Sequence, residues 1–101
     1  MVNPNRRIVV DEEAKHSLRY AYDYIRTQSL QNAKKVIIGI LDSIKKLASN
    51  PEMHPPDKYR IDHDKSFRAY ELHSYRITYH VSPEEIRIIR IRHTKMNPVE
   101  Y

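Results

Sequence analysis

The spacing of apolar residues changes along the chain, and this change constrains the fold more than any other feature. Between Ser29 and Asn50, apolar residues recur at intervals of three and four, the period of an amphipathic helix. Beyond residue 67 the period falls to two, as in a strand with one buried face. Both periods are satisfied together when helices cover one face of a sheet. The expected core contains Ile37, Ile40, Leu41, Ile44, Ile77, Tyr79, Ile89 and Ile91.

Two helices are predicted before Pro51. Asp11 is a favourable N-cap for a first helix over residues 12–28, and Ser29 is the corresponding cap of a second. The second helix ends at Asn50-Pro51, because proline lacks the amide proton and restricts the residue before it. The connection between the helices is only a few residues long, so the two should form an antiparallel hairpin. A short strand, residues 7–10, precedes them.

Three further strands are predicted at residues 67–72, 75–81 and 86–92, with turns at His73-Ser74 and at residues 82–85. Their close spacing predicts an antiparallel meander. Residues 51–66 are polar and proline-rich, and should form an exposed loop in which residues 58–61 could add a strand edge. The predicted fold class is α+β, in the order β-α-α-β-β-β. A helical hairpin covers one face of a small antiparallel sheet within one domain, residues 1–101.

The composition excludes several function classes. The 101 residues carry a net charge of +5 and a pI of about 9.5, which favours negatively charged partners. Without cysteine there is no disulfide, no thiol nucleophile and no cysteine zinc site. Gly39 is the only glycine, so a glycine-rich phosphate loop is excluded. Gly39 lies in the second predicted helix, where it should admit a bulky neighbour such as a tyrosine of the first helix.

No metal, cofactor or membrane contact is expected. His63, between Asp62 and Asp64, belongs to the only local cluster of metal-ligating residue types. Aspartates in loops more often accept hydrogen bonds from their own backbone. No stretch approaches the roughly 18 apolar residues that span a bilayer, so a soluble cytoplasmic protein is expected.

Strand alternation places Arg76, Arg90 and Arg92 on one face of the sheet, which suits a polyanion. Cleavage of RNA by its own 2′-hydroxyl needs a proton acceptor, fixed cations and an acid for the leaving oxygen. Together with the three arginines, His93, Lys95 and Tyr101 supply suitable groups. The same residues also have purely structural explanations. Arginines on an open sheet face are often only solvated, strand alternation puts His93 on the same face as Ile89, and a terminal tyrosine can fray. Both interpretations remain open from the residues alone.

The amino-acid sequence resembles that of the RelE/ParE superfamily of bacterial type II toxins, which are found on plasmids and chromosomes as stabilization modules. The resemblance covers nearly the whole chain, from RIVV through KLASNP, and its specific part is YRITYHV followed by IRIIRIRHTKMNP. It implies a cytoplasmic toxin that inhibits growth and is neutralised by a cognate antitoxin. Such antitoxins wrap an extended or helical segment across the toxin. The assembly could be a homodimer or a toxin–antitoxin heterotetramer.

The tail distinguishes two branches of this superfamily. HTKM followed by a short polar stretch is similar to the ParE branch, which poisons DNA gyrase. Arg76 after Tyr75, with Lys95 and Tyr101 at the end, is similar to the RelE branch, which cleaves mRNA on the ribosome. The loop before the Tyr75 strand has aspartates interleaved with its basic residues, where ribosome-dependent members are densely basic. This departure favours ParE.

Two main functions follow, with different site residues. A gyrase inhibitor would use Arg76, Arg90, Arg92, His93, Lys95 and Met96 as binding residues. A metal-independent ribonuclease would use Arg76, His93, Lys95 and Tyr101 for catalysis. A third function, a basic nucleic-acid-binding module without toxicity, fits less of the sequence.

Overall fold

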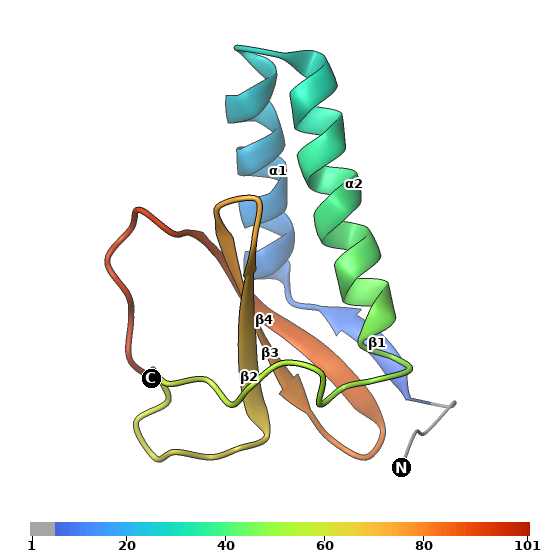
Figure 1. Ribbon diagram of the computed structural model, residues 1–101, viewed down its shortest axis with the longest axis vertical. Helices are drawn as coiled ribbons and strands as arrows, with labels where there is room; N and C mark the ends of the chain where they lie inside the picture. Colours follow the sequence, from blue (N-terminus) through green and yellow to red (C-terminus); the bar gives the residue numbers. More distant parts are fainter. Residues whose placement is uncertain (1–5) are drawn as a thin grey trace.

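The computed structural model describes residues 6–101, and in this range it contains a helical hairpin and a four-stranded sheet (Figure 1). Both helices pack on one face of the sheet and project beyond its end. The predicted α+β class and element order are confirmed. The elements are β1 (Arg7–Val10), α1 (Glu12–Arg26), α2 (Leu30–Lys46), β2 (Phe67–Leu72), β3 (Tyr75–Val81) and β4 (Glu85–His93).

The strand order is β1-β4-β3-β2. The meander of β2, β3 and β4 is antiparallel as predicted, but β1 pairs in parallel with β4, with Ile8 opposite Ile86. The prediction of a wholly antiparallel sheet is therefore wrong for this pair. The helical hairpin explains the difference, because two parallel strands require a long crossover connection between them.

The two helix caps behave differently. The Ser29 hydroxyl accepts a hydrogen bond from the Asn32 amide at 3.0 Å, which confirms it as the N-cap of α2. Asp11 occupies the N-cap position of α1, but its carboxylate instead accepts a hydrogen bond from Arg87 Nη1 at 2.6 Å. Asp11 thus ties the start of α1 to β4. Both helices end earlier than predicted, at Arg26 and Lys46.

A β-bulge in β4 decides which of its isoleucines are buried. Ile88 lies opposite Tyr79 and Arg90 lies opposite Thr78, so Ile89 is an extra residue. The alternation reverses there, and Ile88 is fully buried while Ile89 is outside the core. The prediction of Ile89 as a core residue is wrong for this reason.

The rest of the predicted core is largely confirmed. The prediction of Leu41 as a core residue is wrong, because Leu41 is 39% exposed, and Ile37 is only partly buried against the core. Tyr70 and Tyr75 are buried as well as Tyr79, so tyrosines contribute more to the core than predicted. The largest fully buried side chains are Tyr79, Ile40, Leu47, Ile77, Ile86 and Ile88.

Gly39 contacts the β2–β3 turn. His73 and Ser74 have φ values of 52° and 70°, as the two central residues of a tight hairpin turn require. A Cβ added at Gly39 would lie 2.6 Å from His73 Nε2. The bulky neighbour is therefore this histidine, and the predicted helix-one tyrosine is wrong.

Gly39→Ala should show the effect of this contact on stability. Alanine in a helix interior gains roughly 0.5–1 kcal/mol over glycine, but here the His73 ring must move. We expect the full gain in a His73→Ala background and a smaller gain, or a loss, in the native one. Thermal or urea unfolding of the four proteins of this double-mutant cycle measures the difference. Equal effects in both backgrounds would contradict the contact.

Candidate functional site

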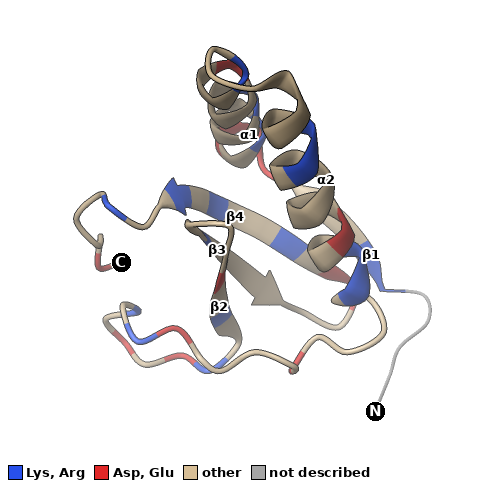
Figure 2. Ribbon diagram, turned by 45° about the horizontal axis from the view of Figure 1, so that its top comes forward, with Lys and Arg blue, Asp and Glu red and all other residues tan. Residues whose placement is uncertain are grey.

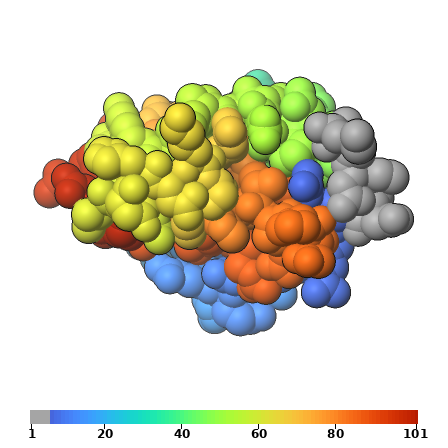
Figure 3. Space-filling model, turned by 90° about the horizontal axis from the view of Figure 1, so that it is seen from below, coloured from blue at the N-terminus to red at the C-terminus, as the bar shows by residue number. Residues whose placement is uncertain are grey.

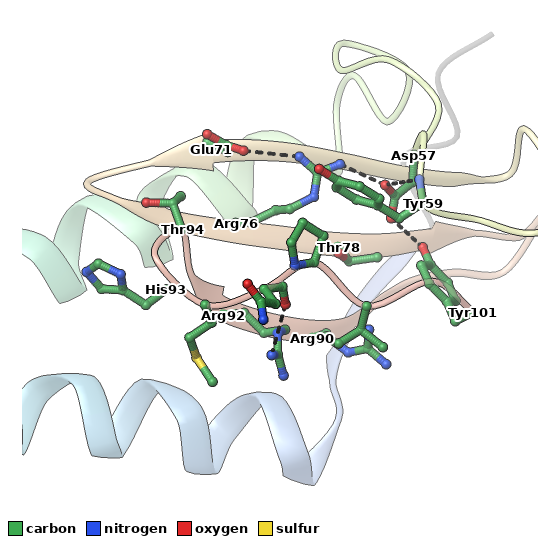
Figure 4. Close-up of a pocket in the computed structure, with 14 residues that line it drawn as sticks. Asp57, Tyr59, Glu71, Arg76, Thr78, Arg90, Arg92, His93, Thr94 and Tyr101 are labelled. Atoms are coloured by element: carbon green, nitrogen blue, oxygen red, sulfur yellow. Dashed lines mark hydrogen bonds and ion pairs between the residues drawn. The ribbon is translucent and has the colours of Figure 1, made fainter.

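The site lies on the face of the sheet opposite the helices, beneath the tail, residues 94–101 (Figure 4). Arg76 pairs with Arg92 and Thr78 pairs with Arg90 across β3 and β4, so these side chains share one face, as the alternation predicts. A hollow of about 70 Å³ lies among them. Part of this face is covered, because Asp57, Tyr59 and the tail also line the hollow.

Asp57 is the centre of the site. Its carboxylate accepts hydrogen bonds from Arg76 Nη2 at 2.7 Å, from the Tyr101 hydroxyl at 2.6 Å and from the Tyr59 amide at 3.1 Å. The Asp57 side chain is only 1% exposed. A buried carboxylate is costly unless its oxygens are hydrogen-bonded, and here donors from a strand, the tail and the loop bind it. Asp57 therefore joins three segments that are distant in the sequence.

The loop and the tail hold one another in place. The Tyr101 amide donates to the Tyr59 carbonyl at 3.1 Å, and the Ile61 amide donates to the Tyr101 carbonyl at 2.7 Å. Figure 3 shows the end of the tail in red against the yellow-green loop. Residues 58–61 do not form a strand with the sheet, and Asp57 is buried, so the prediction of a wholly exposed loop is wrong. Tyr101 does not fray, because these backbone bonds fix it.

The pKa values of the two partners reflect the shared hydrogen bond. Burial alone would raise the pKa of Asp57, but the hydrogen bonds from Tyr101 and Arg76 lower it below its ordinary value. Burial, and then the hydrogen bond to Asp57, raise the pKa of Tyr101 above its ordinary value. Asp57 is accordingly ionised and Tyr101 protonated near neutral pH. Tyr101 keeps its proton in this arrangement and is a poor general base.

The charge of Arg76 is compensated inside the protein. Besides Asp57, its guanidinium donates to Glu71 Oε2 at 3.2 Å, and it lies 4.9 Å from the centre of the Tyr59 ring. Within the described residues, its buried Nε has no hydrogen-bond partner. Arg76 therefore holds the site together, and an incoming anion would compete with two carboxylates for it.

Arg90 and Arg92 differ from Arg76. Within residues 6–101, neither forms an ion pair with a carboxylate. Arg92 Nη2 donates to the Asn97 carbonyl at a long 3.4 Å, and the Arg90 guanidinium lies 5.3 Å from the centre of the Tyr101 ring. Figure 2 shows the basic residues as blue bands along β4. These two arginines are the cations of the site that remain available to an acidic partner.

The remaining predicted site residues lie where the tail leaves β4. His93 Nδ1 accepts a hydrogen bond from the Lys95 amide at 3.0 Å, and the His93 ring packs edge-on against Tyr75 with centroids 5.1 Å apart. Lys95 and Met96 are exposed. Of the four proposed catalytic residues, Arg76 and Tyr101 meet at Asp57, while Lys95 lies outside the lining of the hollow.

The aspartates on either side of His63 bind backbone amides of their own loop. The carboxylates of Asp62 and Asp64 accept hydrogen bonds from the Asp64 and Ser66 amides, as expected of loop aspartates. Among the described residues, no three histidine or acidic side chains are grouped to hold a metal ion. No helix in residues 6–101 is long and apolar enough to cross a membrane.

Comparison with known proteins decides the family. Residues 8–98 match the family model described as the ParE toxin of the type II toxin-antitoxin system parDE. The chain belongs to the ParE toxin family. ParE membership, in a two-component toxin–antitoxin system, implies a cognate antitoxin as the partner.

A solved structure has the same fold as this ParE-family chain. The chromosomal ParDE system from P. aeruginosa matches with a TM-score of 0.71 and 20% sequence identity, over 92% of this chain and 100% of that one. It is among 11 matching chains of solved structures. No curated protein sequence matches.

Sequence reasoning missed the central residue of this ParE site. In the sequence, Asp57 is only one of the aspartates interleaved with the basic residues of the loop before the Tyr75 strand. The available signal was an aspartate next to two prolines, Pro55 and Pro56, in the long connection between α2 and β2. That signal does not reveal its partners, because Arg76 and Tyr101 lie 19 and 44 residues further along the sequence.

Proposed function

We propose that this ParE-family toxin acts in the cytoplasm by inhibiting DNA gyrase, and that it does not cleave RNA. Family membership supports the first part, since the match extends over residues 8–98. The hydrogen bonds of Asp57 support the second part. They occupy Arg76 and Tyr101, two of the residues that a ribonuclease would need.

The contacts of Asp57 are the observation that carries this proposal. A ribonuclease of this type needs cations free to stabilise charge on the phosphate, and a group ready to exchange a proton. Here an ionised, buried carboxylate accepts hydrogen bonds from both candidate groups. A phosphate in the same place would meet this carboxylate as well, and like charges repel. The arrangement stabilises the folded chain and disfavours a scissile phosphate.

A ribosome-dependent nuclease is the second candidate, and one observation favours it. Arg76 and Tyr101 bind the two oxygens of a single carboxylate, so both side chains can reach one anion. Displacement of Asp57 by a phosphate would give them a substrate. This route must break three hydrogen bonds of a buried carboxylate before any RNA binds, so we rank it below gyrase inhibition.

The cognate antitoxin is proposed to approach with an acidic segment. Arg76 already has internal partners, so Arg90 and Arg92 are the arginines that would attract it. Strand addition is a second means of contact. The sheet edge at β2 is partly covered, because Pro56 forms a bridge with Arg68, so within residues 6–101 β1 offers the freer edge. A hydrogen-exchange footprint confined to the outer side of the helices, away from β1 and β4, would contradict this.

Tyr101→Phe separates the two candidate functions. The change removes one hydrogen bond to a charged group, worth about 1.5–3 kcal/mol, and leaves the ring contacts. If the protein is a gyrase inhibitor, toxicity should survive the change. It should instead depend on the helical hairpin and on residues 93–98. Growth after induction in cells measures toxicity, with plasmid supercoiling and mRNA integrity followed together.

Whether plasmid supercoiling or mRNA integrity is lost first after induction distinguishes the two functions. Loss of supercoiling should come first, with mRNA intact, for both the native protein and Tyr101→Phe. Early mRNA cleavage at codons that disappears in Tyr101→Phe, in a variant that still folds, would support the ribonuclease.

A further inference from the structure

The solvent side of α2 carries a row of apolar residues that the core does not use. Leu30, Ile38 and Leu41 are 48%, 57% and 39% exposed. Together with Lys34 and Lys45 they recur at intervals of three and four residues, so these five side chains share one side of the helix. We call them the outer stripe. Single exposed aliphatic residues are ordinary, but a row of them flanked by charges marks an interaction surface.

The outer stripe is basic as well as apolar. Lys34 and Lys45 belong to it, and Lys35 and Lys46 follow them directly in the helix. Within residues 6–101, none of these four lysines forms an ion pair. Asp42 is the one acidic residue of α2. The exposed aliphatic side chains are therefore surrounded by positive charge that the described part of the chain does not compensate.

A hollow beside the outer stripe has room for a side chain. It lies between the two helices and has a volume of about 480 Å³. Its lining consists of Ile37 and Leu41 from α2 and of Leu18, Arg19, Tyr22, Asp23 and Arg26 from α1. Asp23 and Arg26 form an exposed ion pair at 3.9 Å, and Arg19 has none in the described range. The hollow thus combines aliphatic walls with an excess of positive charge.

We propose that this toxin docks on its target protein through the outer stripe, at an apolar projection of the target that is flanked by carboxylates. An apolar side chain of the target enters the hollow beside Leu41 and packs on Ile38, while the carboxylates pair with Lys34 and Lys45. The inference rests on the proposed function, since DNA gyrase is the target that would supply this projection. It places target binding on the helices, on the other side of the sheet from the face of Arg76 and Asp57.

Two other occupants match the outer stripe less well. In a symmetric dimer of this chain, a twofold axis through the middle of the stripe would place Lys34 of one copy against Lys45 of the other, and like charges repel. A nucleic-acid backbone would pair with the lysines but would offer only phosphate and sugar to Ile38 and Leu41. A protein surface that is both acidic and apolar complements the lysines and the aliphatic side chains together.

The test measures inhibition of supercoiling by purified DNA gyrase. Ile38→Ser and Lys34→Glu should each raise the toxin concentration for half-inhibition by about tenfold or more, equivalent to about 1.4 kcal/mol. Matched controls lie in the loop before β2, where Ile61→Ser replaces an isoleucine that is 64% exposed and Lys65→Glu reverses an exposed lysine. Each control should change the half-inhibitory concentration less than about twofold.

A second readout separates target binding from folding. The protein encoded by the adjacent reading frame should bind all four variants as it binds the native chain, because its proposed contacts are Arg90, Arg92 and the β1 edge. Isothermal titration calorimetry measures this affinity, and thermal unfolding verifies that each variant folds. Loss of this affinity in a folded outer-stripe variant would assign the stripe to the antitoxin and overturn the proposal.

The remaining outcomes distinguish the inference from the proposed function. If the native chain inhibits gyrase and both outer-stripe variants inhibit it equally well, the docking surface is wrong and the proposed function stands. If the native chain does not inhibit gyrase, the proposed function fails and the inference fails with it. Binding of duplex DNA alone at about 0.15 M salt, lost in Lys34→Glu, would overturn the proposal. A dimer of the native chain that Ile38→Ser converts to a monomer would overturn it as well.

Discussion

Replacing Ile88 with alanine is expected to lower the free energy of unfolding by about 2–5 kcal/mol, because the side chain is fully buried and its loss leaves a cavity. Ile89→Ala is the matched control, one residue along the same strand. Ile89 is the extra residue of the bulge and lies outside the core, so its replacement should cost under about 1 kcal/mol. Urea unfolding of the three proteins measures both losses.

The comparison tests the register of β4. Without the bulge, Ile89 and Ile91 would face inward together and Ile88 would face the tail. A larger loss for Ile89→Ala than for Ile88→Ala would show that register and contradict the structure. Ile77→Ala, at a fully buried position on β3, should cause the same large loss in either register and calibrates the measurement.

Asp57→Asn is expected to destabilise the protein by about 3 kcal/mol, because removing one partner of a buried ion pair leaves the other charge uncompensated. Arg76 would keep Glu71, but that carboxylate is largely exposed and contributes little. The tail would also lose its charged anchor at Tyr101. Asp62→Asn serves as the control, since Asp62 is an exposed carboxylate in the same loop and its ion pair is solvated. Asp62→Asn should therefore change stability far less than Asp57→Asn does.

The pH dependence of stability gives an independent readout of Asp57. Its pKa is lowered in the folded state from an ordinary value of 3.8, so the folded chain favours the ionised form. The stabilisation is therefore present above the unfolded pKa and is lost as pH falls through the folded pKa. Asp57→Asn should flatten the fall in stability below about pH 4. If the free energy of unfolding of Asp57→Asn falls at low pH as steeply as that of the native protein, Asp57 does not form these hydrogen bonds.

Much of the fold follows from local patterns in the sequence. From Ala33 to Leu47, apolar residues recur at the helical period over about four turns, and the β3 residues alternate without interruption, so both elements have the predicted type. The sequence IRIIRIR of β4 is different. Isoleucines occupy both even and odd positions of this strand, so either face of the strand could be the buried one. The choice between Ile88 and Ile89 depends on pairing with β3, which the local pattern does not contain.

The site follows from the sequence only in part. The shared face of Arg76, Arg90 and Arg92 depends on strand period and was predictable. The partners of Arg76 were not, because Asp57 reaches it through a loop whose path depends on the whole fold. Tyr20 and Tyr24 show the same limit. They flank the apolar stripe of α1, yet their side chains are 75% and 59% exposed, so the described chain leaves most of both uncovered.

The most direct test of the proposed function is a supercoiling assay with purified DNA gyrase, relaxed plasmid and ATP, run beside programmed ribosomes with mRNA. The native toxin and Tyr101→Phe are expected to inhibit supercoiling to the same extent, and both should leave the mRNA uncut. Codon-specific mRNA cleavage by the native protein, abolished in Tyr101→Phe and accompanied by normal supercoiling, would contradict the account.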